Sequence, residues 1–255
     1  MYVTFAHTLF QEATSIRIAD KVAFSYHLDR GFRKKPQIID IGVTEMGNMD
    51  GRVALITGSS RGIGEYMARH FARAGAKVAI AARTIEVTDK RLPGTILSVA
   101  ESIRSEGGDA TAVQMNMRDP ESIKTGINQT VEHFGGLDII VNNAAILVPG
   151  SLESVQDRHL DLIWQIDLKG PLLLMKYSLE HLKEFGSGDI INVSSIAAVF
   201  PGPGPYDTTS QRRDGSFYGM VKSGLERFSQ GLARELQSDS IKVNVLSPQG
   251  RIRTP

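Results

Sequence analysis

The sequence predicts an α/β fold in which a doubly wound parallel sheet is flanked by helices on both faces. Two patterns support this prediction. From Arg52 onward, short apolar runs alternate with longer stretches in which apolar residues recur at helical spacing. The short runs are almost continuously apolar, which is typical of strands that have helices packed against both of their faces.

Six apolar runs predict the strands of this sheet. In chain order the expected strands are 53–56, 78–82, 110–115, 137–143, 189–195 and 242–246. Strands that alternate with helical stretches form strand–helix–strand units, and such units build a parallel sheet.

The stretches between these strands predict helices. In the first of them, Ile63, Met67 and Phe71 share one helical face, and Gly75 ends the helix. Gly107-Gly108 ends the second in the same way. The expected helices are 63–74, 95–106, 120–134, 158–185 and 217–237.

The composition is that of a globular protein and excludes several classes of function. Lys and Arg number 29 against 28 Asp and Glu, so the chain has no global field that attracts nucleic acid or an anionic membrane. It has no Cys, and its six His show no metal-ligand spacing. No apolar run reaches the ~20 residues of a membrane span, and no signal peptide begins the chain. We expect a cytoplasmic protein without a metal, membrane or nucleic-acid partner.

A glycine-rich turn follows the first strand. Its sequence is Thr-Gly-Ser-Ser-Arg-Gly-Ile-Gly over residues 57–64, and it leads into an amphipathic helix. Glycines at this place let backbone N–H groups approach a pyrophosphate at the positive end of the helix. The Lys-Ser/Thr pair of a nucleotide kinase or GTPase loop is missing. The turn therefore predicts a Rossmann-type dinucleotide site formed by Gly58, Ser60, Arg61, Gly62, Ile63 and Gly64.

The charges near this turn favour NADP(H) over NAD(H). Proteins that bind NAD place a carboxylate after the second strand to bind the ribose hydroxyls, whereas the 2′-phosphate of NADP needs a cation. The second strand ends at Ala82-Arg83 without an acid, and Arg61 adds a second cation. A guanidinium suits a phosphate dianion. We therefore expect NADP (NADPH) as the cofactor, and NAD fits less well.

Three side chains predict acid–base chemistry on an oxygen. Tyr218 and Lys222 open the last helix four residues apart, so they share one face. A phenol has a pKa of about 10, and a neighbouring ammonium lowers this pKa, which makes the phenol a general acid and base. Ser195 ends the fifth strand, where open α/β sheets place their sites. Ser194 is the alternative for its role, because strand alternation puts the two serines on opposite faces.

In combination, these residues resemble the short-chain dehydrogenase/reductase family, of the single-domain and NADP-preferring kind. The resemblance covers about residues 50–254. It implies hydride transfer between NAD(P)(H) and a carbonyl or secondary alcohol. Tyr218 would be the proton donor, Lys222 would lower the pKa of Tyr218 and hold the nicotinamide ribose, and Ser195 would orient the substrate oxygen. The other cofactor-binding residues that the motifs imply are Asn116, Asn142, Ala144, Pro248 and Thr254.

The chain also departs from the family pattern. Asp167 stands where the family has a catalytic Asn, and its charge can pair with Lys222 and weaken the effect of Lys222 on Tyr218. The segment after Ser195 is longer than usual and is expected to loop over the site. Tyr206 lies in this segment but is followed four positions later by Ser, so Tyr218 is preferred. Because relatives continue beyond the equivalent of residue 255, we expect a truncated C-terminal sheet edge without a substrate lid.

Two domains and two functions follow. Residues 1–48 carry no motif and are expected to be an N-terminal extension of unknown role, whereas residues 49–255 form the dinucleotide-binding catalytic domain. The leading hypothesis is an NADPH-dependent reductase of a small carbonyl substrate, assembled as a homo-oligomer (dimer or tetramer). The alternative is a catalytically weak or inactive dinucleotide-binding protein, such as a redox sensor or scaffold, which the charge of Asp167 motivates.

Overall fold

The computed structural model describes residues 49–87, 93–148, 150–199 and 216–248. The proposed extension 1–48 therefore lies outside the described residues, as do Tyr206 and Thr254. The compact unit that contains the predicted motifs runs from Asp50 to Pro255.

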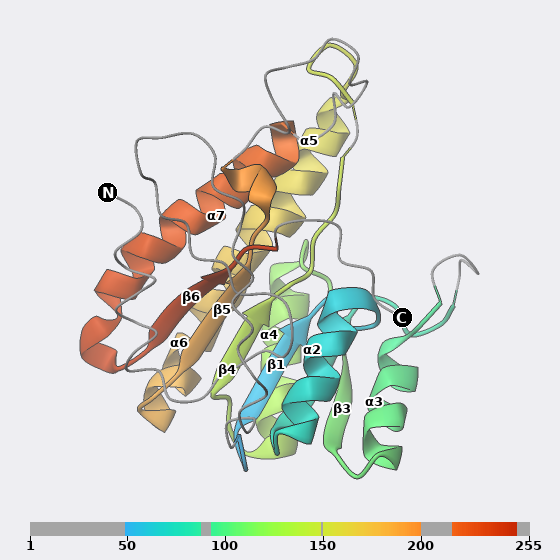
Figure 1. Ribbon diagram of the computed structural model, residues 1–255, viewed down its shortest axis with the longest axis vertical. Helices are drawn as coiled ribbons and strands as arrows, with labels where there is room; N and C mark the ends of the chain where they lie inside the picture. The colour runs from blue at the N-terminus through green and yellow to red at the C-terminus, as the bar shows by residue number, and fades with distance from the viewer. Residues whose placement is uncertain (1–48, 88–92, 149, 200–215, 249–255) are drawn as a thin grey trace, which may run out of the picture. The chain divides into compact units, whose positions relative to one another are not determined.

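Six strands form one parallel sheet in the order β3-β2-β1-β4-β5-β6 (Figure 1). The predicted doubly wound α/β fold is therefore confirmed. The strands are β1 (Val53–Thr57), β2 (Lys77–Ala82), β3 (Asp109–Gln114), β4 (Ile139–Asn142), β5 (Asp189–Val193) and β6 (Lys242–Leu246). Their apolar side chains form the core, and Leu55, Ile80, Ile140 and Ile190 are fully buried.

The helices cover both faces because the chain reverses its direction of winding after β3. Right-handed crossovers place α2 and α3 on one face, and α4, α6 and α7 on the other. In agreement, α2 contacts α3, and α4 contacts α6. The helices are α2 (Gly62–Arg73), α3 (Ile96–Ser105), α4 (Pro120–Phe134), α5 (Asp157–Trp164), α6 (Gly170–Phe185) and α7 (Ser216–Glu235).

One predicted helix differs in detail from the expectation. The stretch 158–185 is helical, but residues Gln165–Lys169 form a π-helical segment, η1, between α5 and α6. Such segments often occur at functional sites, because the extra residue per turn re-aims a side chain. Here the segment contains Asp167, which is fully buried.

The fold brings the predicted site residues to one edge of the sheet. The winding reverses between β1 and β4, and the crevice beyond the carboxyl ends of strands at such a point is where open α/β sheets bind ligands. The glycine turn follows β1, Arg83 follows β2, Asn143 follows β4 and Ser195 follows β5. All four positions therefore belong to the same edge.

Candidate active site

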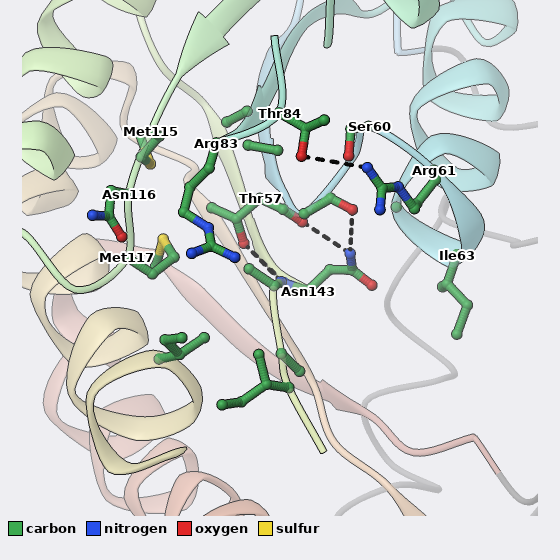
Figure 2. Close-up of a pocket in the computed structure, with 18 residues that line it drawn as sticks. Thr57, Ser60, Arg61, Ile63, Arg83, Thr84, Met115, Asn116, Met117 and Asn143 are labelled. Carbon is green, nitrogen blue, oxygen red and sulfur yellow. Dashed lines mark hydrogen bonds between the residues drawn. The ribbon is translucent and has the colours of Figure 1, made fainter. Parts of the chain in front are cut away.

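An open cavity of about 330 Å³ lies at this edge, beyond the ends of β1, β2 and β4 (Figure 2). Of the residues predicted to bind a cofactor, the cavity is lined by Gly58, Ser60, Arg61, Ile63, Gly64, Arg83, Asn116 and Ala144. No Asp or Glu is among the described residues that line it. The cavity thus combines a glycine turn with two guanidinium groups and carries no opposing negative charge.

Close backbone packing explains why the turn contains glycine. Gly58 has a φ of +67°, and a Cβ there would lie 2.8 Å from the Cα of Ala144. A Cβ on Gly64 would lie 2.4 Å from the carbonyl oxygen of Gly58 and 2.6 Å from Nδ2 of Asn143. The turn and the chain after β4 therefore touch through their backbones, and side chains at these glycines would force them apart.

Asn143 fixes the turn in place, a role that the sequence did not assign to it. Its Nδ2 donates to the carbonyl oxygens of Thr57 (2.9 Å) and Gly58 (3.2 Å), and its backbone N–H donates to Oγ1 of Thr57 (3.0 Å) (Figure 2). The sequence assigned a cofactor contact to the neighbouring Asn142 and none to Asn143. The path of the chain after β4 decides which of the two side chains faces the turn, and the sequence alone does not reveal this path.

Asn142 has a different environment from the one expected. Its side chain is buried, its Nδ2 donates to Oδ1 of Asn192 (2.8 Å), and Nδ2 of Asn192 donates to Oγ of Ser229 (2.8 Å). These bonds tie β4, β5 and α7 together. Asn142 does not line the cavity. A direct contact with a cofactor thus stays a prediction for Asn142, whose visible bonds are structural.

The two arginines of the cavity have different surroundings. Nη2 of Arg61 donates weakly to Oγ1 of Thr84 (3.3 Å) and to the carbonyl oxygen of Gly94 (3.2 Å), while its buried Nε has no hydrogen-bond partner. Arg83 has no hydrogen bond or ion pair with the described residues, and Figure 2 shows it on the other side of Thr57 from Arg61. Cations that no carboxylate neutralises fit a phosphate-bearing ligand.

The predicted catalytic trio lies where β5 ends and α7 begins, and consists of Ser195, Tyr218 and Lys222. The Ser195 hydroxyl lies close enough to that of Tyr218 to lower its pKa in part. Nζ of Lys222 lies 5.5 Å from the centre of the Tyr218 ring and donates to the carbonyl oxygen of Val193 (2.9 Å). Gly219 allows the start of α7 to pack closely against the chain after β5. A Cβ at this position would lie only 2.5 Å from the carbonyl oxygen of Ala197. The predicted trio is therefore one cluster.

The two candidate serines face different partners. Ser195 begins the short helix η2 (Ile196–Ala198), where its Oγ accepts from the N–H of Ala197 (3.2 Å). Oγ of Ser194 instead donates to Oε1 of Glu226 on α7 (2.5 Å), and Ser194 is 2% exposed. Contact with Tyr218 favours Ser195 for the predicted role. The carbonyl oxygen of Pro248 accepts from the N–H of Ile196 (3.1 Å), which puts Pro248 next to this site.

Asp167 lies behind Lys222 in the same cluster. Its Oδ1 accepts from the N–H of Ile146 (2.9 Å), and its Oδ2 lies 4.0 Å from Nζ of Lys222 without a hydrogen bond. Burial raises the pKa of this carboxyl to about 6, against the lowering effects of Lys222 and Ile146. Because the pKa of Asp167 is higher in the folded protein than in the unfolded chain, its ionised form destabilises the fold. This cost is fully present above about pH 6 and disappears below about pH 4, the pKa of the carboxyl in the unfolded chain.

The pKa of Tyr218 differs in direction from the expectation. Burial, followed by the charge of Asp167, raises it to about 12, and the Ser195 hydroxyl only partly opposes this. Burial also lowers the pKa of Lys222, while Asp167 raises it. The net pKa of Tyr218 is therefore raised and not lowered, chiefly because the phenol is buried. A lowering effect of Lys222 on this pKa stays a prediction.

The described residues form neither a metal-ligand cluster nor a membrane-spanning helix. No group of three or more His, Cys, Asp and Glu side chains in that part of the chain is placed to hold a metal ion. Among the same residues, no helix has the length and apolar character needed to span a bilayer.

Comparison with known proteins gives consistent matches. Residues 52–255 match the sequence model of a family described as short chain dehydrogenase. A hydroxysteroid dehydrogenase-like protein 2 from Bos taurus is 35% identical over 209 residues, which are 82% of this chain and 47% of that protein. An uncharacterized oxidoreductase from Thermotoga maritima is 37% identical over 202 residues, covering 79% of this chain and 72% of the relative. The chain thus spans about half the length of the first relative.

Solved structures also match. A gluconate 5-dehydrogenase from Burkholderia cenocepacia J2315, in complex with NADP and tartrate, superposes with a TM-score of 0.68 at 27% identity. The match covers 79% of this chain and 72% of that one. Other matched structures likewise contain NADP or NADPH.

Proposed function

This chain belongs to the short-chain dehydrogenase/reductase family of NAD(P)-dependent oxidoreductases, and we propose that it transfers hydride between NADP(H) and a carbonyl or secondary alcohol. The observation that carries the proposal is the cluster of Ser195, Tyr218 and Lys222, with Nζ of Lys222 5.5 Å from the centre of the Tyr218 ring, at the edge of the sheet that also holds the glycine turn. This arrangement supports an acid and a hydrogen-bond donor that act together at the edge where we propose the dinucleotide binds.

The cavity supports a dinucleotide as the cofactor. Gly58 and Gly64 leave a backbone cradle that a Cβ would fill, and the N-terminus of α2 favours a pyrophosphate there. Arg61 and Arg83 would hold the 2′-phosphate of NADP. When bound, the nicotinamide supplies or accepts the hydride.

The cluster supplies the rest of the reaction. During reduction, the Tyr218 hydroxyl would give its proton to the carbonyl oxygen of the substrate as that oxygen gains negative charge. The Ser195 hydroxyl would hydrogen-bond the same oxygen and orient it. Lys222 is held by the carbonyl of Val193 and lies on the same helical face as Tyr218, where it would bind the nicotinamide ribose.

A carbonyl panel tests this proposal. With NADPH in excess, the purified chain should consume NADPH, measured by absorbance, only when an accepted ketone or aldehyde is present. If NADPH binds and no member of the panel is reduced, the alternative of a sensor or scaffold is favoured. The observation that supports this alternative is the fully buried charge of Asp167.

The preference for NADPH should depend on the two cavity arginines. Replacing Arg61 or Arg83 with Gln should weaken NADPH binding by roughly 10- to 100-fold and leave NADH binding nearly unchanged, since a charged hydrogen bond contributes about 1.5–3 kcal/mol. Thermal unfolding with each nucleotide measures this, because a ligand that binds only the folded state raises the melting temperature. Arg158→Gln, at an exposed position on α5, is the matched control. Equal losses of affinity for NADPH and NADH would contradict the proposed role of the two arginines in binding the 2′-phosphate.

Assembly and location remain proposals as well. A homo-oligomer could form through the helices α5 and α7, where Trp164 is 51% exposed and Phe228 is 42% exposed. A cytoplasmic location also remains a prediction from the sequence.

A further inference from the structure

A buried carboxylate stands behind the pair of side chains that carries the proposed chemistry. Asp167 is 0% exposed, and the N–H of Ile146 holds its Oδ1 at 2.9 Å. Its Oδ2 is buried, has no hydrogen-bond partner and lies 4.0 Å from Nζ of Lys222. The position is fixed by the π-helical segment η1 on one side and by the chain after β4 on the other.

The groups that face Asp167 are few. Two titratable groups of α7 interact with Asp167: the charge of Lys222 lowers the pKa of Asp167, and the charge of Asp167 raises the pKa of Tyr218. The chain after β4 contributes the neutral N–H of Ile146, and β5 contributes the carbonyl of Val193, which accepts from Lys222. Lys169 of the same π-helical segment is exposed. The ammonium of Lys222 is thus opposed by one carboxylate, so the pair has no net charge.

We infer that Asp167 is a positioning residue whose buried charge opposes the ammonium of Lys222, makes the Tyr218 anion harder to form and so biases the site toward carbonyl reduction. The inference rests on the proposed function. In reduction, the carbon–oxygen π bond of the substrate breaks, its carbon gains the hydride from NADPH, and its oxygen gains the Tyr218 proton, leaving an alcohol, NADP⁺ and a tyrosinate that takes a proton from water. Alcohol oxidation needs Tyr218 as the anion from the start, and a second anion beside Asp167 is disfavoured by like-charge repulsion.

The direction of the pKa shifts agrees with this geometry. Asp167 raises the pKa of Tyr218, and the pKa of Asp167 itself is about 6, so its carboxylate is ionised at neutral pH. Below about pH 6 the carboxyl gains a proton, and Lys222 then acts on Tyr218 without opposition.

Titration of Tyr218 tests the inference without turnover. The ultraviolet absorbance of tyrosinate is measured against pH in the nucleotide-free protein, and the signal of a Tyr218→Phe variant is subtracted. In Asp167→Asn, which keeps an oxygen for the N–H of Ile146, the midpoint should fall by at least about one pH unit. Asp161→Asn, at an exposed position of α5, should leave it unchanged. The pH at which alcohol oxidation begins should fall by the same amount in Asp167→Asn, with the KM for the carbonyl unchanged.

An unchanged or higher midpoint in a folded Asp167→Asn protein would overturn the inference. If that variant does not fold, the wild-type protein decides, because a Tyr218 that ionises below about pH 9 would also overturn it, a free phenol having a pKa of about 10. A midpoint that falls as expected, in proteins that bind NADPH but reduce no carbonyl, would uphold the coupling of Asp167 to Tyr218 and refute the proposed function.

Discussion

Replacing Tyr218 with Phe should lower kcat for carbonyl reduction by about 10²- to 10⁴-fold, the usual contribution of a positioned acid. The substitution removes only the hydroxyl beside Ser195 and leaves the ring packed against the core. Because Tyr218 does not line the cavity of the glycine turn, the affinity for NADPH should change little. Steady-state kinetics together with an NADPH titration separate the two effects.

A matched tyrosine provides the control for this substitution. Tyr177 lies on α6, partly buried, with Nζ of Lys124 5.1 Å from its ring centre. Tyr177→Phe should keep full activity. A Tyr218→Phe protein that reduces carbonyls at the wild-type rate would show that another group donates the proton.

Replacing Gly64 with Ala should weaken dinucleotide binding by roughly 10- to 100-fold. The new Cβ would lie 2.4 Å from the carbonyl oxygen of Gly58 and 2.6 Å from Nδ2 of Asn143, and one of these is backbone that cannot move without opening the turn. Strain of this kind costs about 1–3 kcal/mol, and the opened turn would misplace the N–H groups that face a pyrophosphate. Calorimetric titration with NADPH measures the loss.

Gly231→Ala is the comparison for this glycine. Gly231 is exposed on α7, and a Cβ there would meet only Nη1 of Arg227, at 3.8 Å. An Ala in a helix is favoured over Gly by about 1 kcal/mol, so this variant should bind NADPH normally and melt at a slightly higher temperature. Normal NADPH affinity in Gly64→Ala would contradict the assignment of the turn as the cradle.

Local patterns were sufficient to predict the sheet and the position of the site. The apolar runs predicted all six strands. The signal is clearest in the four inner strands, which are buried almost throughout because helices cover both of their faces. The glycine turn was recognisable because it lies between a strand and an amphipathic helix. Ser195 and Tyr218 could be brought together from the sequence, since strand ends of a parallel sheet share one edge.

Details that depend on packing were not predictable in the same way. Helical periodicity predicted one helix over 158–185 and did not reveal the π-helical segment that aims Asp167 at Lys222. The charge balance around Tyr218 needs the degree of burial as well as the spacing of four residues, so the direction of its pKa shift was missed. The sequence also did not reveal that Asn143 holds the glycine turn, because the path of the chain after β4 decides which of two adjacent asparagines faces that turn.

The fate of the hydride tests the central claim most directly. NADPH that carries deuterium at the transferring position of its nicotinamide is incubated with the wild-type chain and a carbonyl panel, and the alcohols are analysed by mass spectrometry. The account predicts one deuterium on the former carbonyl carbon of each product molecule, and far less product from Tyr218→Phe in the same time. Tight NADPH binding with no deuterium in any product would contradict it.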